Sequence, residues 1–464
     1  MILTLARRSL LSRPLRSAVL AGGFGLGVSV MVALLGIGDV ILDQARAPAL
    51  VGGGDVIVGS ETGRVGSARF VLAEVLSGGS PGDRVKVASP CRRSSLYLIV
   101  DQGSTPMAAR GGIPSLERAL GDPETSGAAT WIDTPADREW ASPTREQVLR
   151  AMDRFHSIPD VPARAGSWSE WLYFNGRAGS TRFYLTFFAG PRVAPFKRML
   201  GVRLQLERKG ALSAYSSSSL VTDEQLALAP DVTAGPNRVR LIGSEYHIHI
   251  DLGAESGGPR AAGDLVVRAE RGRSLPPFTM HGAGGWVSGY VVPVMAGALA
   301  GAITIGGETL DLSGGTGYHD HNWGFWEGVR WQWGQVQGGG LAFVYGRVYP
   351  PADAADAGRL PGFLVALGSE GPVGYATNVS IQEADSGVGQ APRRLVVSGR
   401  GESLVVTLQI DVDQIATTRT AVGSFGGGMN FLQLRGTYRV SGHVGDRTVD
   451  FTAPGSAETF RRQK

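Results

Sequence analysis

The sequence has 464 residues, 68 of them glycine, with a net charge of +4 and a single cysteine. This length has room for two or three domains of about 150 residues each. The lone Cys91 excludes an internal disulfide framework and a cysteine-based zinc site. The basic residues are mostly scattered arginines without a dense run, so we expect no nucleic-acid partner.

An uncharged stretch of 22 residues, 17–38, follows the arginine-rich N-terminal residues of the chain. As a helix rising about 1.5 Å per residue, it would cross a hydrocarbon core of about 30 Å. The positive-inside rule then places the N-terminus in the cytoplasm and everything after Asp39 outside. We therefore predict a single-pass anchor in the inner (cytoplasmic) membrane over residues 1–43, with the body on the periplasmic or extracellular side. The arginines before the stretch are Arg7, Arg8, Arg13 and Arg16.

A cleaved signal peptide is the alternative to an anchor. Residues 45–47 read Ala-Arg-Ala, which resembles a cleavage site, but Pro48 follows directly and should hinder cleavage. The apolar stretch also exceeds the roughly 7–15 residues of a signal-peptide core. These two features favour a retained helix.

Residues 44–166 are the least informative part of the chain. Residues 85–87 and 96–100 are strand-like, and glycine pairs punctuate the segment as turns. One helix is well marked, with Ser142 as candidate N-cap and Pro143 at the first helical position. We predict a small extracytoplasmic α+β segment followed by a linker. The apolar stripe of the helix consists of Val148, Leu149, Met152 and Phe155.

From Trp168 onward the pattern changes to strand-like runs separated by glycine-rich turns. No long amphipathic helix interrupts them, which is typical of β-sandwiches and barrels. Composition alone therefore predicts a mainly antiparallel β body. The strand-like runs are 182–188, 202–206, 245–252, 264–269, 341–348, 394–398, 403–412, 431–440 and 447–452.

The stretch 317–324, Gly-Tyr-His-Asp-His-Asn-Trp-Gly, concentrates polar and aromatic side chains. Buried polar groups must find partners, so such a cluster is costly as ordinary structure. A carboxylic acid kept neutral by an apolar wall can protonate an isolated carbon–carbon double bond, and Asp320 is our candidate acid. The faces of Tyr318 and Trp323 can stabilise the cation, and His319 or His321 can relay a proton from water. Alternatively, Asp320 orders a tight turn and the histidines cap loop carbonyls.

Metal binding is a competing interpretation of the histidines. His319 and His321 share one strand face, as do His247 and His249. In the second pair, however, Ile248 and its neighbours alternate with the histidines as in an ordinary half-buried strand. No carboxylate or cysteine spacing matches a zinc template, so we expect neither a metal nor a cofactor.

The 318–324 box resembles the Tyr-His-Asp-His-Asn-Trp-Gly signature of the carotenoid 1,2-hydratase (hydroxyneurosporene synthase, CrtC) family and its AttH-like relatives. Residues 170–176, Glu-Trp-Leu-Tyr-Phe-Asn-Gly, resemble that family's upstream box, with Leu172 where the family has a second tryptophan. The resemblance runs from Trp168 to the C-terminus. It implies two lipocalin-like β domains, 167–325 and 326–464, with a ligand cavity at their junction. It also supports Tyr318 and Asp320 as site residues.

The remaining candidate ligand-binding residues surround these two boxes. His281 and Trp286 are further apart than the His–Trp pair of the hydratases, which weakens the expectation of strict hydratase activity. Glu170 is a single acid in an aromatic strand, where a strand-end hydrogen bond is an equally good interpretation. The candidates are Glu170, Trp171, Tyr173, His281, Trp286, Asn322, Trp323 and Trp326.

The N-terminal segment also resembles the first membrane helix of MacB/FtsX-like ABC transporter permeases, including a Gly-Asp-hydrophobic run at 54–58. Three hypotheses follow for the whole chain. The first is a membrane-anchored CrtC/AttH-like lyase that hydrates or cyclises an apolar isoprenoid or lipid-like substrate. The second is a non-catalytic lipid-binding accessory protein of an ABC exporter. The third is a relic permease domain with a structural role.

Overall fold

The computed structural model describes residues 56–59, 67–75, 85–100, 103–122, 131–358, 360–369, 371–384, 391–419 and 429–462, with seven isolated positions before residue 67. The chain divides into two compact units, one formed by residues 1–62 and 87–141 and the other by 63–86 and 142–464. The predicted membrane segment falls almost wholly outside the described residues. Within the described residues, no helix is long and apolar enough to cross a membrane.

The described residues between 87 and 141 of the first unit form an antiparallel hairpin and two short helices. Arg110 on the hairpin forms ion pairs with Glu117 and Asp122, which ties the hairpin to the segment that follows it. The strand expected at 96–100 belongs to this hairpin, whereas residues 56–58 and 85–87 are not in strands. The elements are β1 (Arg92–Val100), β2 (Gly103–Gly111), α6 (Pro114–Ala119) and α8 (Pro135–Ala141).

The helix predicted near residue 142 is α9, Arg145–Met152. Its N-cap is Thr144 rather than Ser142, because Thr144 and Gln147 exchange hydrogen bonds in a capping box that satisfies two backbone donors. The helix ends at Met152, and Asp153 follows it directly. The other helical segments of the second unit are α4 (Ala68–Phe70), η1 (Val71–Val75), η2 (Ala165–Ser167), α10 (Asp223–Leu226) and η3 (Ala283–Gly285).

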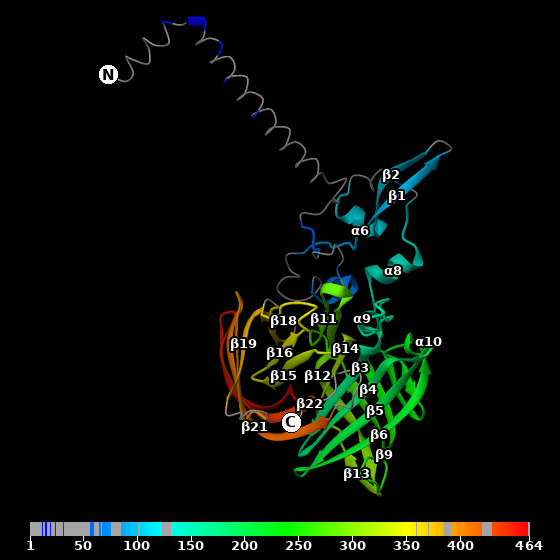
Figure 1. Cartoon of the computed structure of the whole chain (residues 1–464), viewed down its shortest axis with the longest axis vertical. Helices are drawn as coiled ribbons and strands as arrows, with labels where there is room; N and C mark the ends of the chain where they lie inside the picture. The colour runs from blue at the N-terminus through cyan, green and yellow to red at the C-terminus, as the bar shows by residue number, and fades with distance from the viewer. Residues whose placement is uncertain are drawn as a thin grey trace. The chain divides into compact units, whose positions relative to one another are not determined.

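The first sheet of the second unit is a closed barrel. Strand β10 pairs with both β12 and β9, which closes the ring β10-β12-β14-β3-β4-β5-β6-β9. Figure 1 shows the neighbouring strands β3, β4, β5 and β6 of this ring. The strands are β3 (Trp168–Ala178), β4 (Thr181–Ala194), β5 (Lys197–Arg208), β6 (Ala211–Thr222), β7 (Val232–Ala234), β8 (Asn237–Ile242), β9 (Glu245–Ala254), β10 (Ala261–Arg268), β11 (Leu275–His281), β12 (Val287–Ile305), β13 (Glu308–Asp311) and β14 (Gly315–Phe325).

Alternation of apolar and polar side chains gives barrel strands such as β9 one buried face. In β9, Tyr246, Ile248 and Ile250 are buried, while His247 and His249 are partly exposed. Side chains of successive strand residues point to opposite faces, so each strand presents one row to the barrel interior and another to its outside. The predicted assignment of the β9 faces is confirmed. In β3 and β14 both faces are largely buried, and the alternating direction of the side chains decides where the candidate site residues lie.

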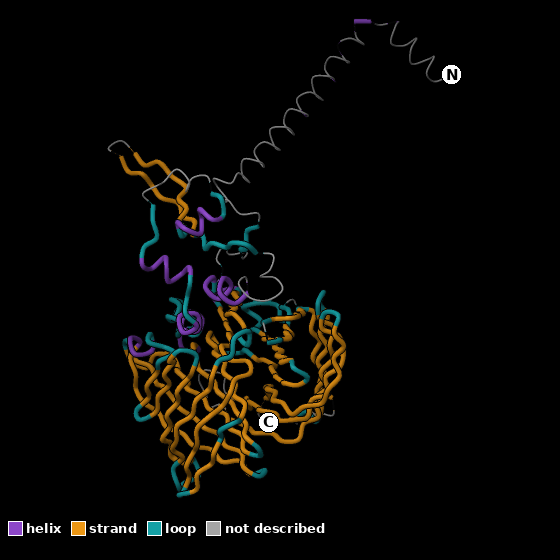
Figure 2. Tube along the Cα trace, turned by 180° about the vertical axis from the view of Figure 1, so that it is seen from behind, coloured by secondary structure: helices purple, strands orange, loops and turns teal. Residues whose placement is uncertain are grey.

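The second sheet has nine antiparallel strands in the order β18-β17-β16-β15-β23-β22-β21-β20-β19. Its own apolar core includes Phe343, Tyr345 and Tyr438. The prediction of a mainly β fold with two lipocalin-like antiparallel domains is confirmed. Figure 2 shows the strands in orange. The strands are β15 (Arg330–Gly338), β16 (Leu341–Tyr349), β17 (Phe363–Leu367), β18 (Pro372–Ala376), β19 (Asn378–Ala384), β20 (Arg394–Arg400), β21 (Leu404–Arg419), β22 (Met429–Val444) and β23 (Arg447–Arg462).

The two sheets pack against each other inside the second unit. Trp333 and Val344 of the second sheet belong to the same apolar cluster as the barrel interior. An ion pair between Arg435 on β22 and Glu207 on β5 links the sheets at another point. The outer face of the barrel strands β3 and β14 is therefore covered by the second sheet.

Candidate active site

Strands β3 and β14 are neighbours, and their register sorts the signature residues into two rows. Asp320 lies opposite Tyr173, and Asn322 lies opposite Trp171. One residue further along, His321 lies opposite Leu172 and points to the other face. The signature stretch therefore serves two separate environments, one on each side of the same strand.

The first environment is a cavity of about 580 Å³ between the barrel and the second sheet. Its size lies within the usual range of about 300–1,000 Å³ for small-molecule sites. Arg203 and Glu255 form an ion pair on its wall, and each is about one-third exposed, so the cavity reaches the surface. Much of the wall is aromatic: Trp171, Tyr173, Tyr184, Phe188, Phe278, Tyr290, Trp326, Trp331, Trp333, Phe363 and Phe431.

The Asp320 carboxyl is set into this wall and is only 4% exposed. The Tyr318 hydroxyl donates to its Oδ2 at 2.8 Å, and the Asn322 amide donates to its Oδ1 at 2.9 Å. The hydroxyl of Tyr290 lies 2.8 Å from the Tyr318 hydroxyl and accepts a hydrogen bond from the Trp333 indole at 2.8 Å. These bonds fix the orientation of the carboxyl.

Burial raises the pKa of Asp320 well above its usual value, and the nearby Glu458 carboxyl raises this pKa further. The hydrogen bonds from Tyr318 and Asn322 act in the opposite direction but are outweighed. Among the residues that the structure describes, neither lysine nor arginine pairs with Asp320. Burial thus favours the neutral, proton-carrying form of this carboxyl beside an aromatic cavity.

A second carboxyl, Glu458 on β23, faces the same cavity from the second sheet. Trp331 donates to its Oε2 at 3.4 Å. Burial raises the pKa of Glu458 to about 7, and hydrogen bonding with Trp331, Gln433 and Tyr173 offsets only part of that rise. The cavity therefore contains two acids with raised pKa values, one from each sheet.

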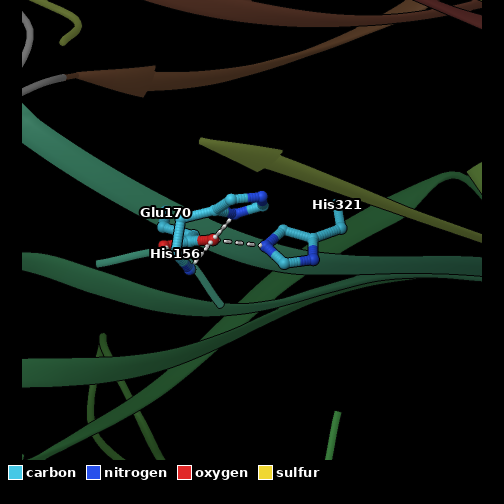
Figure 3. A group of neighbouring side chains, drawn as sticks. All are labelled: His156, Glu170 and His321. Carbon is cyan, nitrogen blue, oxygen red and sulfur yellow. Dashed lines mark hydrogen bonds and ion pairs between the residues drawn. The ribbon is translucent and has the colours of Figure 1, made fainter. Parts of the chain in front are cut away.

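The second environment is the barrel interior, where the two histidines of the signature lie fully buried. Asp153 connects them, because His319 Nε2 lies 2.9 Å from its Oδ2 and His321 Nδ1 lies 2.9 Å from its Oδ1. His321 Nε2 lies 2.9 Å from Glu170, which also contacts His156 Nδ1 at 2.7 Å (Figure 3). We call these five residues the His–carboxylate network.

The carboxylates of the network stabilise the charged form of His321. Burial alone would lower the pKa of His321, but hydrogen bonds to the carboxylates of Asp153 and Glu170 outweigh it and raise this pKa to about 9. Burial would raise the pKa of Asp153, yet His319 and His321 hold it below its usual range. A cationic imidazole between two carboxylates thus joins the helix α9 end to strands β3 and β14.

Three members of the network, His156, Glu170 and His321, offer ligand atoms within 4.8 Å of one another, the kind of set that can hold a metal ion. Both ring nitrogens of His321 are already bonded to carboxylates. A metal would have to displace the proton that these carboxylates hold on His321. We assign the group the role of a buried ion-pair network rather than a metal centre.

The structure brings part of the predicted site together at the cavity. Asp320, Asn322, Trp171, Tyr173 and Trp326 line it, and Tyr318 contacts Asp320 from behind. Leu172, which replaces a family tryptophan, faces the barrel interior and does not shape the cavity.

The other predicted residues lie away from the cavity. His319, His321 and Glu170 belong to the His–carboxylate network on the opposite strand face, so neither histidine is placed to relay a proton to the cavity. Trp323 stacks on His156 with ring centroids 4.0 Å apart. The remaining two do not line the cavity either: His281 is exposed at the end of β11, and buried Trp286 donates to the Phe325 carbonyl at 3.0 Å.

Sequence reasoning missed the residues that come from distant segments. Glu458 and Gln433 lie on the last two strands, and Asp153 and His156 follow helix α9. A signal existed for Glu458, the only acid in the second half of β23. The sequence signal for Asp153 was weaker: it is an acid next to the last apolar position of an amphipathic helix.

No protein-family model matches this chain, and no curated protein matches its sequence. Solved structures with a similar fold include an AttH-like protein from Nitrosomonas europaea, with 18% identity over 63% of this chain and 92% of that one and a TM-score of 0.43. Kievitone hydratase from Nectria haematococca has 13% identity over 67% and 96%, with a TM-score of 0.45. CghA with Sch210972 has 14% identity over 70% and 96%, with a TM-score of 0.43. These likenesses are too distant to assign a reaction.

Proposed function

We propose that this protein catalyses cofactor-free hydration or cyclisation at a carbon–carbon double bond of an apolar, isoprenoid or lipid-like substrate. Asp320 donates the proton that starts the reaction. The observation that carries this proposal is a buried carboxyl on the cavity wall, held by Tyr318 and Asn322 and paired with no lysine or arginine among the described residues. A simple lipid carrier has no need for such an acid.

The chemistry of the cavity agrees with this role. Protonation of an alkene produces a carbocation, and aromatic faces such as those of Trp171, Trp326 and Trp331 attract positive charge. The wall near Arg203 and Glu255 is polar, so an amphipathic substrate can place its apolar part against the aromatic residues and its polar end toward solvent. The acid and the cation-stabilising surface thus share one space.

Deuterium labelling tests the proposal whichever product is formed. We would incubate the protein in deuterium oxide with a panel of acyclic alkenes: geraniol, farnesol, geranylgeraniol and lycopene. We expect a product or recovered alkene that carries deuterium on carbon. Isoprenoids that bind but never acquire deuterium would instead support the non-catalytic, lipid-binding alternative.

Binding of an isoprenoid should depend on the tryptophans that line the cavity. Replacing Trp331 with alanine removes an aromatic wall that contacts Trp326 and Phe431, and we expect geranylgeraniol affinity to fall about tenfold, or roughly 1.4 kcal/mol. Quenching of tryptophan fluorescence measures it. Trp131→Ala, in the other unit, is the matched control and should retain the affinity. Equal affinities for both variants would place the ligand elsewhere. Trp323, predicted as a ligand contact, does not line this cavity.

We further propose that the N-terminal segment anchors the protein in the inner membrane, where it can meet ABC exporter subunits. The support is the uncharged 17–38 stretch and its preceding arginines. The full chain should sediment with membranes, and deletion of residues 1–43 should release it. Protease added to spheroplasts should digest the body, whereas complete protection would reverse the orientation.

A further inference from the structure

The last two strands of the chain contribute a second group of polar residues to the cavity wall. Glu458 on β23 lies directly opposite Gln433 on β22 and Trp333 on β15. All three line the cavity. Because cross-strand neighbours share a face, this short row across the second sheet confronts the barrel strand that carries Asp320.

Gln433 has an unused acceptor in this row. The side chain is 5% exposed, and its Nε2 donates to the Tyr173 hydroxyl at 3.5 Å. Its Oε1 has no hydrogen-bond partner among the described residues. A buried carbonyl oxygen without a partner is costly, and this one can be satisfied by a small donor in the cavity. Gln433 Oε1 and the Glu458 carboxyl together offer two acceptors, which suits a water molecule or a substrate hydroxyl.

Tyr173 lies between this group of polar residues and the proton donor, Asp320. It is the cross-strand partner of Asp320 on the barrel and lies within hydrogen-bonding reach of Gln433 and Glu458 on the second sheet. Each of the two carboxyls raises the pKa of the Tyr173 phenol, after the larger effect of burial. The acids therefore face the same small region of the cavity from opposite sides.

We infer that Glu458 is the base that activates water for attack on the carbocation, with Gln433 as the residue that positions this water. The inference rests on the proposed function. Asp320 gives its proton to one alkene carbon, and the π electrons form the new carbon–hydrogen bond. Water then forms a carbon–oxygen bond at the cationic carbon and loses a proton to the Glu458 carboxylate. Solvent exchange returns that proton to Asp320, so the net reaction adds one water.

Mutation of Glu458 should therefore separate protonation from water addition. In water labelled with both deuterium and oxygen-18, the wild type should place both labels in the product. Glu458→Gln should lower oxygen-18 incorporation at least about 100-fold. Deuterium should still enter carbon, in isomerised or recovered alkene, because Asp320 is intact. Gln433→Leu should lower oxygen-18 incorporation less strongly and also spare deuterium.

An exposed glutamate that does not line the cavity provides the control. Glu308 on β13 pairs with Arg208 at 2.7 Å, so Glu308→Gln should incorporate oxygen-18 at a rate of the wild-type order. If Glu458→Gln fails to fold by circular dichroism, Glu458→Asp and Gln433→Leu provide the same comparison. Wild-type incorporation of oxygen-18 by folded Glu458→Gln would overturn the role of Glu458 alone. Absence of both labels with the wild type would overturn the proposed function itself.

Discussion

Asp320→Asn should lower turnover at least about 100-fold, the low end for loss of a general acid. The amide keeps the shape of the side chain but has no proton to transfer. Ligand affinity should stay within a few-fold, because the aromatic walls are unchanged. Product formation from the isoprenoid panel measures turnover, and circular dichroism checks the fold. A folded Asp320→Asn protein with wild-type turnover would remove Asp320 from the mechanism.

The pH dependence of the wild type should follow the same acid. Burial and the Glu458 carboxyl raise the pKa of Asp320, so the carboxyl is protonated and active below this raised pKa. Turnover should fall as pH rises through it. The hydrogen bonds from Tyr318 and Asn322, and the charge of His321 on the opposite face of the strand, lower the pKa of Asp320, but their combined effect is the smaller one. If the residual activity of Asp320→Asn shows the same loss at high pH as the wild type, a group other than Asp320 causes that loss.

Asp153→Asn should destabilise the fold by about 3–5 kcal/mol, the usual cost of breaking a buried ion pair. The substitution leaves His319 and His321 fully buried without their shared carboxylate. Chemical denaturation measures the loss. The control is Asp264→Asn, which breaks an exposed His249–Asp264 pair at 2.8 Å and should cost no more than about 1 kcal/mol. Equal losses in the two variants would show that the His–carboxylate network contributes no more to the free energy of unfolding than an exposed ion pair.

The network also predicts how stability varies with pH. The pKa of His321 is raised in the folded state to about 9 from 6.5, so its contribution is fully present below about pH 6.5 and is lost as pH rises through about 9. The pKa of Asp153 is lowered, so its contribution is present above the ordinary aspartate value and is lost in acid. The free energy of unfolding should decline between neutral pH and about pH 10, and Asp153→Asn should flatten this decline.

The sequence was sufficient to predict the fold class because alternation and glycine-rich turns are local signals. It also pointed to Asp320, since an acid between aromatic and amide side chains stands out in a strand. The roles of His319 and His321 could not be separated from that of Asp320 without the register of β14 against β3. One residue of shift sends a side chain from the cavity to the barrel interior.

The partners of these residues were beyond the reach of local patterns. Asp153 reaches the histidines from helix α9, more than 160 residues earlier in the chain. Glu458 and Gln433 reach the cavity from the second sheet. Such contacts depend on how the two sheets pack, and no spacing in the sequence encodes this packing. The cavity was expected only from resemblance. Asp320 was predicted from the sequence, whereas the place of Glu458 on the cavity wall required the structure.

The proposed mechanism requires that Asp320 carries a proton at neutral pH in the resting protein. Infrared difference spectroscopy between the wild type and Asp320→Asn tests this requirement without any substrate. Near neutral pH, the wild type should show a protonated-carboxyl C=O band that is missing in the variant and shifts in deuterium oxide. A difference spectrum that shows only the bands of an ionised carboxylate would contradict the mechanism.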